Sequence, residues 1–200
     1  NPKNALHHNA LGLLLEEQED HKSAARSFRK AIKILPNDAR MHANLGIALK
    51  TIDRKNAVKS FEKCIEIDPN CVDVLTSLGC VLNEMGCFSD ARIKLDQALD
   101  LDPLSGATHH NLGVNYNHLG DSLAAISSLK KAVKYASPGD APKSETMLGM
   151  ELLRTLDFKN GWPALESRWN AEQDSTFINS SKPQWDPTRK GDRVFLWEEQ

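Results

Sequence analysis

The 200-residue sequence has few aromatic residues, no long apolar run and little net charge. Phenylalanine, tryptophan and tyrosine make up 6% of the residues, which favours a core of aliphatic side chains. The longest apolar run, residues 11–15, is far shorter than the roughly 20 residues of a membrane-spanning helix. The formal net charge is −2 and no basic stripe is recognised, so we expect neither nucleic acid nor a membrane as a partner.

The sequence also lacks the usual patterns of catalytic and metal sites. It has no Gly-rich phosphate loop and no order of Ser, His, Asp or Cys that defines a nucleophile. We therefore predict that this chain is not an enzyme and has no cofactor, no catalytic residue and no metal ligand.

Four cysteines occur, but none is spaced like the tight Cys pairs of zinc sites. Cys64, Cys71, Cys80 and Cys87 are seven, nine and seven residues apart. We interpret them as small packing residues, with a metal site or a disulfide as the alternatives. Free thiols are typical of a reducing compartment, so the predicted location is cytoplasmic.

The dominant feature that is present is a repeat of about 34 residues. The pair Leu-Gly recurs with Leu11, Leu45, Leu78, Leu112 and Leu148, at steps of 34, 33, 34 and 36 residues. Four further columns follow the same period: small residues at Ala24, Ala57, Ala91 and Ala125, bulky residues at Phe28, Phe61, Leu95 and Leu129, small residues at Ala31, Cys64, Ala98 and Ala132, and proline at Pro2, Pro36, Pro69 and Pro103. A repeat of this length predicts a solenoid.

Each column has a structural reason in a unit of two helices. Glycine inside a helix costs roughly 1 kcal/mol against alanine. We therefore expect Gly46 to permit close approach of a second helix, with Ala57 facing it and Phe61 filling the space between repeats. Asp68-Pro69 should end the second helix. One helix pair cannot bury its apolar face alone, so stability must come from stacking.

These columns resemble the tetratricopeptide repeat family over about residues 1–170. The resemblance implies an all-α, right-handed αα superhelix, with breaks near Asp20, Asp53, Gly86 and Gly120. The predicted units are the end of an upstream repeat at 1–4, repeats at 5–38, 39–71, 72–105 and 106–139, a degenerate fifth unit at 140–170, and an irregular, β-like tail at 171–200 that begins a truncated domain. Pro163 is tolerated only in the first turn of a helix, which predicts that the last helix starts near Asn160 or Gly161.

In this family the first helix of each repeat lines the concave face, which implies a groove for a protein or an extended peptide. The candidate groove residues are polar: Asn9, Glu16, Asn44, Lys50, Asn83, His110, Asn111, Asn117 and His118. Side-chain amides both donate and accept hydrogen bonds, so they can hold a peptide backbone. The alternative is an ordinary solvated helix surface.

Two finer patterns accompany the groove. Asn44 and Asn111 match the asparagine ladder that precedes Leu-Gly in the O-linked N-acetylglucosamine transferase family, whereas Ala10 and Ser77 interrupt it. A column of histidines, His8, His42 and His109, recurs three residues before the leucine of Leu-Gly. Recurrence at the repeat spacing predicts that these histidines lie at the repeat interface.

The C-terminal sequence carries a second resemblance. Asp157-Phe158, Gly161-Trp162, Arg168-Trp169, residues 183–186 and residues 191–200 are similar to the hinge of bacterial tetratricopeptide proteins that continue into a glycosyltransferase-like domain. The resemblance implies an alternative function as the substrate-presenting arm of a glycosyltransferase. A third alternative is self-association through the array ends or the tail, where the apolar run 194–197 would dock near Trp162 and Trp169 or on another copy.

Overall fold

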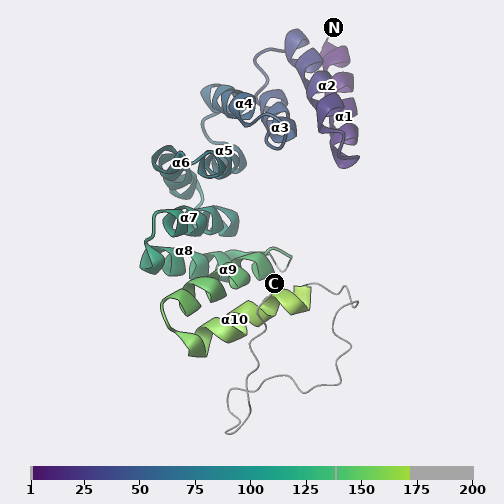
Figure 1. Ribbon diagram of the computed structural model, residues 1–200. Coiled ribbons are helices and arrows are strands. Elements are labelled where there is room, and N and C mark those ends of the chain that lie inside the picture. The colour runs from purple at the N-terminus through teal and green to yellow at the C-terminus, as the bar shows by residue number, and fades with distance from the viewer. Residues whose placement is uncertain (1, 138, 172–200) are drawn as a thin grey trace, which may run out of the picture.

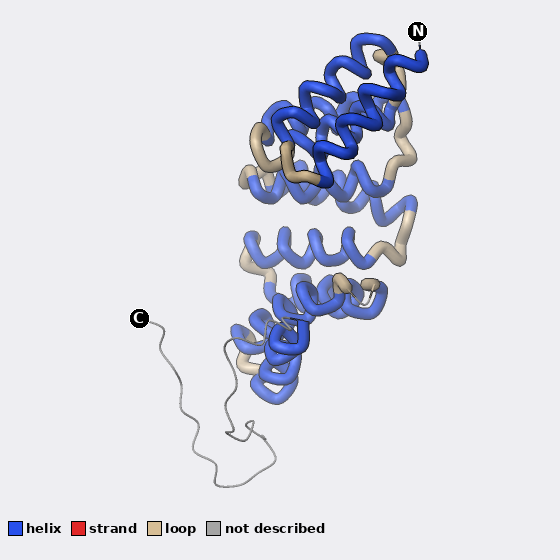
Figure 2. Tube along the Cα trace, turned by 90° about the vertical axis from the view of Figure 1, so that its right-hand side faces the viewer, coloured by secondary structure: helices blue, strands red, loops and turns tan. Residues whose placement is uncertain are grey.

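The computed structural model describes residues 2–137 and 139–171, and its secondary structure there is entirely helical. Ten helices follow one another within these residues: α1 (Pro2–Glu17), α2 (His21–Ile34), α3 (Ala39–Leu49), α4 (Arg54–Ile67), α5 (Val72–Glu84), α6 (Phe88–Leu101), α7 (Gly106–His118), α8 (Ser122–Tyr135), α9 (Ala141–Arg154) and α10 (Phe158–Ala171). They form five antiparallel pairs that stack into a curved array, with its two ends far apart (Figure 1; Figure 2). The predicted all-α superhelix is confirmed. The predicted β-like tail lies outside the described residues.

The breaks inside the pairs lie where the sequence predicts them. Asp20, Asp53 and Asp121 directly precede α2, α4 and α8, and each side chain accepts a hydrogen bond from the backbone N–H three residues on, at 3.0 or 3.3 Å. Such caps satisfy backbone donors that a helix start would leave unpaired. Gly86 and Gly120 have φ of 77° and 76°, a left-handed conformation that glycine adopts without strain.

One helix boundary differs from the prediction. α1 begins at Pro2 and thus includes residues before the predicted first repeat, whose bounds stay a prediction. α10 begins at Phe158, so the prediction of a start near Asn160 or Gly161 is wrong. The reason is Asp157, whose side chain accepts a hydrogen bond from the backbone N–H of Asn160 at 3.3 Å and starts the helix earlier. Pro163 consequently lies inside α10 rather than in its first turn.

The glycine of Leu-Gly makes room for a bulky side chain of the second helix. A Cβ atom added to Gly46 would lie 2.4 Å from the ring of Phe61, and one added to Gly79 would lie 2.6 Å from Leu95. The expectation that Ala57 also faces Gly46 stays a prediction. Phe61 is fully buried, and glycine is required because the ring lies directly against the backbone of α3.

Three columns of each first helix are buried where one repeat meets the preceding one. Their members are at most 9% exposed: Met41, Leu45 and Ala48 in α3, Val74, Leu78 and Val81 in α5, Thr108, Leu112 and Asn115 in α7, and Ser144, Leu148 and Glu151 in α9. In α1, which has no preceding helix among the described residues, the equivalent Leu11 and Leu14 are 47% and 58% exposed. These columns therefore form the joints of the array.

Candidate functional site

The first helices of the pairs form the candidate binding face. Figure 1 shows α1, α3 and α5 along the inner side of the curve, with α2, α4 and α6 on the outer side. Every predicted groove residue lies on a first helix or at its end. What each can offer a ligand depends on how much of its hydrogen-bonding capacity other repeats already use.

Asn9 and Asn44 meet between α1 and α3. Nδ2 of Asn44 donates to Oδ1 of Asn9 at 2.9 Å, and both side chains are half-buried. The bond uses one donor of Asn44 and one acceptor of Asn9. Nδ2 of Asn9 and Oδ1 of Asn44 make no hydrogen bond within the described residues, so this pair keeps both a donor and an acceptor.

Asn83 and Asn111 are used differently. Asn83 is 5% exposed; its Nδ2 donates to the carbonyl of Asn111 at 3.0 Å, and its Oδ1 accepts from Nδ2 of Asn115 at 2.7 Å. Nδ2 of Asn111 donates to the carbonyl of Ala107 in its own helix at 3.1 Å. Asn83 therefore joins α5 to α7 instead of facing a groove.

The joint between α7 and α9 occupies two more candidates. Nδ1 of His110 lies 2.9 Å from Oγ of Ser144, and burial, with a smaller effect of Lys143, lowers the pKa of His110. Asn117 donates to Oε1 of Glu151, a buried carboxylate that also pairs with Arg154 at 2.7 Å. Both candidates thus join the fourth and fifth helix pairs.

The remaining candidates lie at the ends of first helices. Oε1 of Glu16 is 3.0 Å from Nδ1 of His21, at the start of α2. The ring of His118 stacks on Phe88, with ring centroids 5.0 Å apart. Lys50, at the end of α3, is exposed. Glu16 and Lys50 thus lie at the turns of their own repeats and His118 contacts the preceding repeat, so these three residues do not line one continuous polar groove.

A hollow of about 290 Å³ lies between α1 and α3 at the Asn9–Asn44 pair. It is lined by Leu6, Asn9, Leu13, Asp38, Arg40, Met41 and Asn44. Leu6 is 50% exposed and Leu13 is 44% exposed. Nη2 of Arg40 lies 2.7 Å from Oδ2 of Asp38, and this hydrogen bond lowers the pKa of Asp38. The hollow thus combines exposed leucine with amide groups.

The first helices also carry an apolar column that the prediction from sequence did not include. The residue after every Leu-Gly is apolar and at least partly exposed: Leu13, Ile47, Cys80, Val114 and Met150. Leu13 and Met150, at the two ends, are 44% and 51% exposed. The sequence does contain a signal for this column, because its positions follow the same period as Leu-Gly itself. The candidate face is therefore less polar than the sequence interpretation implies.

Two members of the histidine column, His42 and His109, bond the turns between repeats. Nε2 of His42 bonds the carbonyl of Pro36 at 2.8 Å, and Nε2 of His109 bonds the carbonyl of Pro103 at 3.0 Å. A carbonyl only accepts, so Nε2 carries the proton in both rings. Each bond ties the start of a first helix to the turn before it.

The cysteines lie at the third helix pair and beside it. Sγ of Cys64 and Sγ of Cys71 are 4.0 Å apart, and all four cysteines are free thiols. Burial raises the pKa of Cys71 to about 12, which keeps the thiol protonated. Within residues 2–137 and 139–171, no three His, Cys, Asp or Glu side chains converge as metal ligands would.

Comparison with known proteins agrees with this geometry. Sequence models of the tetratricopeptide repeat match residues 1–49, 39–71 and 107–137. The chain belongs to the tetratricopeptide repeat family. No curated protein matches it. In the described part of this tetratricopeptide array, every helix is too short or too polar to span a bilayer.

Several solved structures share the tetratricopeptide fold. MamA from Desulfovibrio magneticus RS-1 is 23% identical, with a TM-score of 0.73 over 86% of this chain and 98% of that chain. PilF of Pseudomonas aeruginosa is 20% identical, with a TM-score of 0.75 over 84% of this chain and 77% of that chain. A chain of the APC/C Cut9–Hcn1 hetero-tetramer is 15% identical, with a TM-score of 0.78 over 86% and 34%. At such identities the likeness concerns the fold alone.

Proposed function

We propose that this tetratricopeptide array is a scaffold that binds an extended protein segment on the inner side of α1 and α3. The observation that carries the proposal is the hollow in which exposed Leu6 and Leu13 flank the Asn9–Asn44 pair. An extended segment presents both backbone polar groups and side chains, and this hollow offers partners for both.

The chemistry of the two asparagines fits a peptide backbone. Nδ2 of Asn9 can donate to a carbonyl and Oδ1 of Asn44 can accept from an N–H, since their mutual bond uses neither atom. The leucines supply apolar area, worth about 25 cal/mol per Å² removed from water. The apolar column from Leu13 to Ile47 extends this surface along the array.

The test uses peptides selected from a random phage-displayed library on the whole chain. Asn44→Ala combined with Leu13→Ser should weaken the selected peptides by about ten- to a hundredfold, because it removes hydrogen bonds of 0.5–1.5 kcal/mol each and apolar contact. Asn111→Ala is the matched control. It occupies the same column as Asn44 but does not line the hollow between α1 and α3, so the expected loss is smaller.

The proposal fails if the doubly substituted chain binds the selected peptides as the unchanged chain does. It also fails if Asn111→Ala costs as much affinity as the double change, which would place the ligand along the fourth pair. Circular dichroism and a denaturant midpoint on each variant separate loss of binding from loss of folding.

The alternatives from the sequence remain proposals. The resemblance to a glycosyltransferase hinge falls mainly on residues 172–200, outside the described residues. The arm of a glycosyltransferase would still need a binding face, so that alternative extends the scaffold proposal rather than replacing it. Self-association and a cytoplasmic location likewise stay predictions.

A further inference from the structure

The outer side of the first two repeats is strongly basic. α2 contains five Lys and Arg residues and no Asp or Glu, and α4 contains four Lys and Arg residues and two glutamates. The two helices therefore carry a net charge of +7, whereas the whole chain carries −2. From the net charge of the whole sequence we expected no basic stripe. That expectation is wrong for this surface, because acidic residues elsewhere in the chain offset its positive charge in the total.

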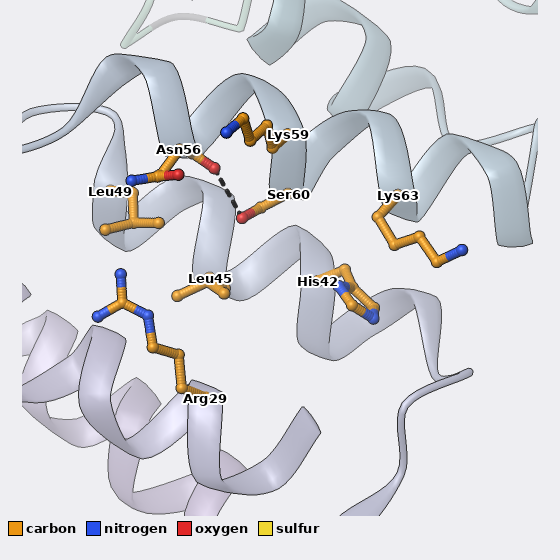
Figure 3. Close-up of a pocket in the computed structure, with 8 residues that line it drawn as sticks. All are labelled: Arg29, His42, Leu45, Leu49, Asn56, Lys59, Ser60 and Lys63. Atoms are coloured by element: carbon orange, nitrogen blue, oxygen red, sulfur yellow. Dashed lines mark hydrogen bonds between the residues drawn. The ribbon is translucent and has the colours of Figure 1, made fainter. Parts of the chain in front are cut away.

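A groove of about 290 Å³ concentrates part of this charge between α2 and α4 (Figure 3). It is lined by Arg29 of α2, His42, Leu45 and Leu49 of α3, and Asn56, Lys59, Ser60 and Lys63 of α4. No carboxylate is among these lining residues. Figure 3 shows the guanidinium of Arg29 reaching from α2 toward Leu49 and Asn56 on the opposite side.

The cations of the groove are largely uncompensated. Lys63 pairs with Glu66 at 2.8 Å. Arg29 and Lys59 make no hydrogen bond or ion pair within the described residues. Their nearby carboxylate is Asp53, whose pKa is lowered first by hydrogen bonds from Asn56 and less by Arg29 and Lys59. Asp53 accepts the capping bonds at the start of α4 and forms no ion pair with either cation within the described residues.

The neutral polar groups of the groove are already engaged. Nδ2 of Asn56 donates to Asp53 at 2.6 Å, and Oγ of Ser60 donates to the carbonyl of Asn56 at 2.8 Å. Nε2 of His42 donates to the carbonyl of Pro36. The strong donors left for a ligand are therefore the guanidinium of Arg29 and the ammonium of Lys59. A guanidinium binds a carboxylate through two parallel hydrogen bonds, and an ammonium adds a mobile point charge.

We propose that this groove, on the opposite side of the array from the inner hollow, binds an acidic segment of a protein. A carboxylate of the segment lies between Arg29 and Lys59, and the adjoining Lys30 and Lys33 of α2 attract further acidic residues. A protein segment fits better than nucleic acid because no Phe, Tyr or Trp lines the groove to stack a base, and because Leu45 and Leu49 form an apolar floor.

The experiment measures fluorescence anisotropy of a labelled ten-residue peptide of Glu, Asp and one central Leu, mixed with the whole chain. The doubly substituted Arg29→Gln, Lys59→Gln chain should lose at least about tenfold in affinity, and the affinity of the unchanged chain should fall with added salt. Both residues are exposed, so the fold should tolerate the change. A denaturant midpoint checks this.

Lys130→Gln with Lys131→Gln is the matched control, because it removes the same charge from exposed positions of α8. An affinity within about twofold of the unchanged chain is expected. Equal loss in the two variants would overturn the proposal, since binding would then follow net charge alone. Absence of peptide binding would also overturn it. A labelled ten-nucleotide single strand that binds more tightly than the peptide, and is weakened by Arg29→Gln with Lys59→Gln, would assign the groove to nucleic acid instead.

Discussion

The joints in the first half of the array and those in the second half use the same columns with different chemistry. Between the first three repeats the columns hold Met41, Leu45, Ala48, Val74, Leu78 and Val81, all buried and apolar. In the later joints they include Thr108, Asn115, Ser144 and Glu151, which are buried and polar. One repeat geometry therefore accepts either apolar contact or a hydrogen-bond network at the same position.

This difference decides which polar residues remain for a ligand. The largest apolar cluster runs from Ala24 to Ala91, and in that half the Asn9–Asn44 pair keeps bonding capacity. In the second half the candidates Asn83, His110 and Asn117 bond across repeats instead. An array whose joints are polar thus uses side chains that would otherwise face a groove, and the ligand-binding potential shifts toward the first two repeats.

The largest expected effect is the loss of a bulky apolar residue from the first half. Phe61→Ala removes a fully buried ring lying against Gly46. It should lower the free energy of unfolding by about 3–5 kcal/mol through lost transfer energy and a cavity. Chemical denaturation measures this. Phe61→Leu is the control, because leucine fills this column at Leu95 and Leu129, and it should cost much less. Equal costs for the two variants would mean that leucine cannot replace the ring at this position.

A reciprocal exchange between the halves tests whether each joint depends on its own chemistry. Asn115→Val removes the donor of both bonds, leaves the buried acceptor Oδ1 of Asn83 without its partner and should cost about 1–3 kcal/mol. Val81→Asn puts an amide into the equivalent apolar joint and should cost a similar amount. The urea denaturation midpoints of both variants measure these two costs. A more stable Asn115→Val chain would show that the polar joint serves something other than stability, since Oδ1 of Asn115 already lacks a partner.

The fold was predictable because the period constrains it at every level. Leu-Gly, the bulky column and the turn prolines each recur, so one interpretation of a single unit applies to all five. The start of α10 was mispredicted because Pro163 was given more weight than the cap at Asp157. That cap belongs to a column, Asp20, Asp53, Asp121 and Asp157, that the sequence also displays.

The candidate site was less predictable. Whether one of its side chains is free to bind a ligand depends on hydrogen bonds between residues 32–35 positions apart in the sequence. Asn83 and Asn44 are both amides on first helices, yet Asn83 is buried against Asn115 while Asn44 keeps an acceptor. They occupy different columns of the repeat, but neither column by itself shows which amide is engaged by the next repeat. The basic groove was hidden for a related reason, since Arg29 and Lys59 are 30 residues apart and meet only when the repeats stack.

A smaller effect on stability is expected at Cys87, where the two halves of the array meet. Cys87 precedes α6 in the column that holds aspartate in the other pairs, and it makes no side-chain capping bond. Cys87→Asp should stabilise the chain by about 1 kcal/mol by accepting a bond from the first turn of α6. Thermal and chemical denaturation report the gain. Cys87→Ala controls for removal of the thiol and should bring no gain. A loss of stability with aspartate would show that Cys87 contributes packing that a cap cannot replace.

The smallest expected effect is a pH dependence confined to the second half. The pKa of His110 is lowered by burial and by Lys143, partly offset by Asp140. On unfolding the ring returns toward its ordinary value of 6.5 and takes up a proton more readily. His110 therefore adds stability that is fully present above about pH 6.5 and decreases as the pH falls below it. His110→Gln should flatten the fall in unfolding free energy between pH 7.5 and 5.5, while keeping a polar partner for Ser144. Asn44→Gln, an amide change in the first half of the array, should leave the slope unchanged. An equal slope with and without His110 would mean that its protonation is not linked to the joint between α7 and α9.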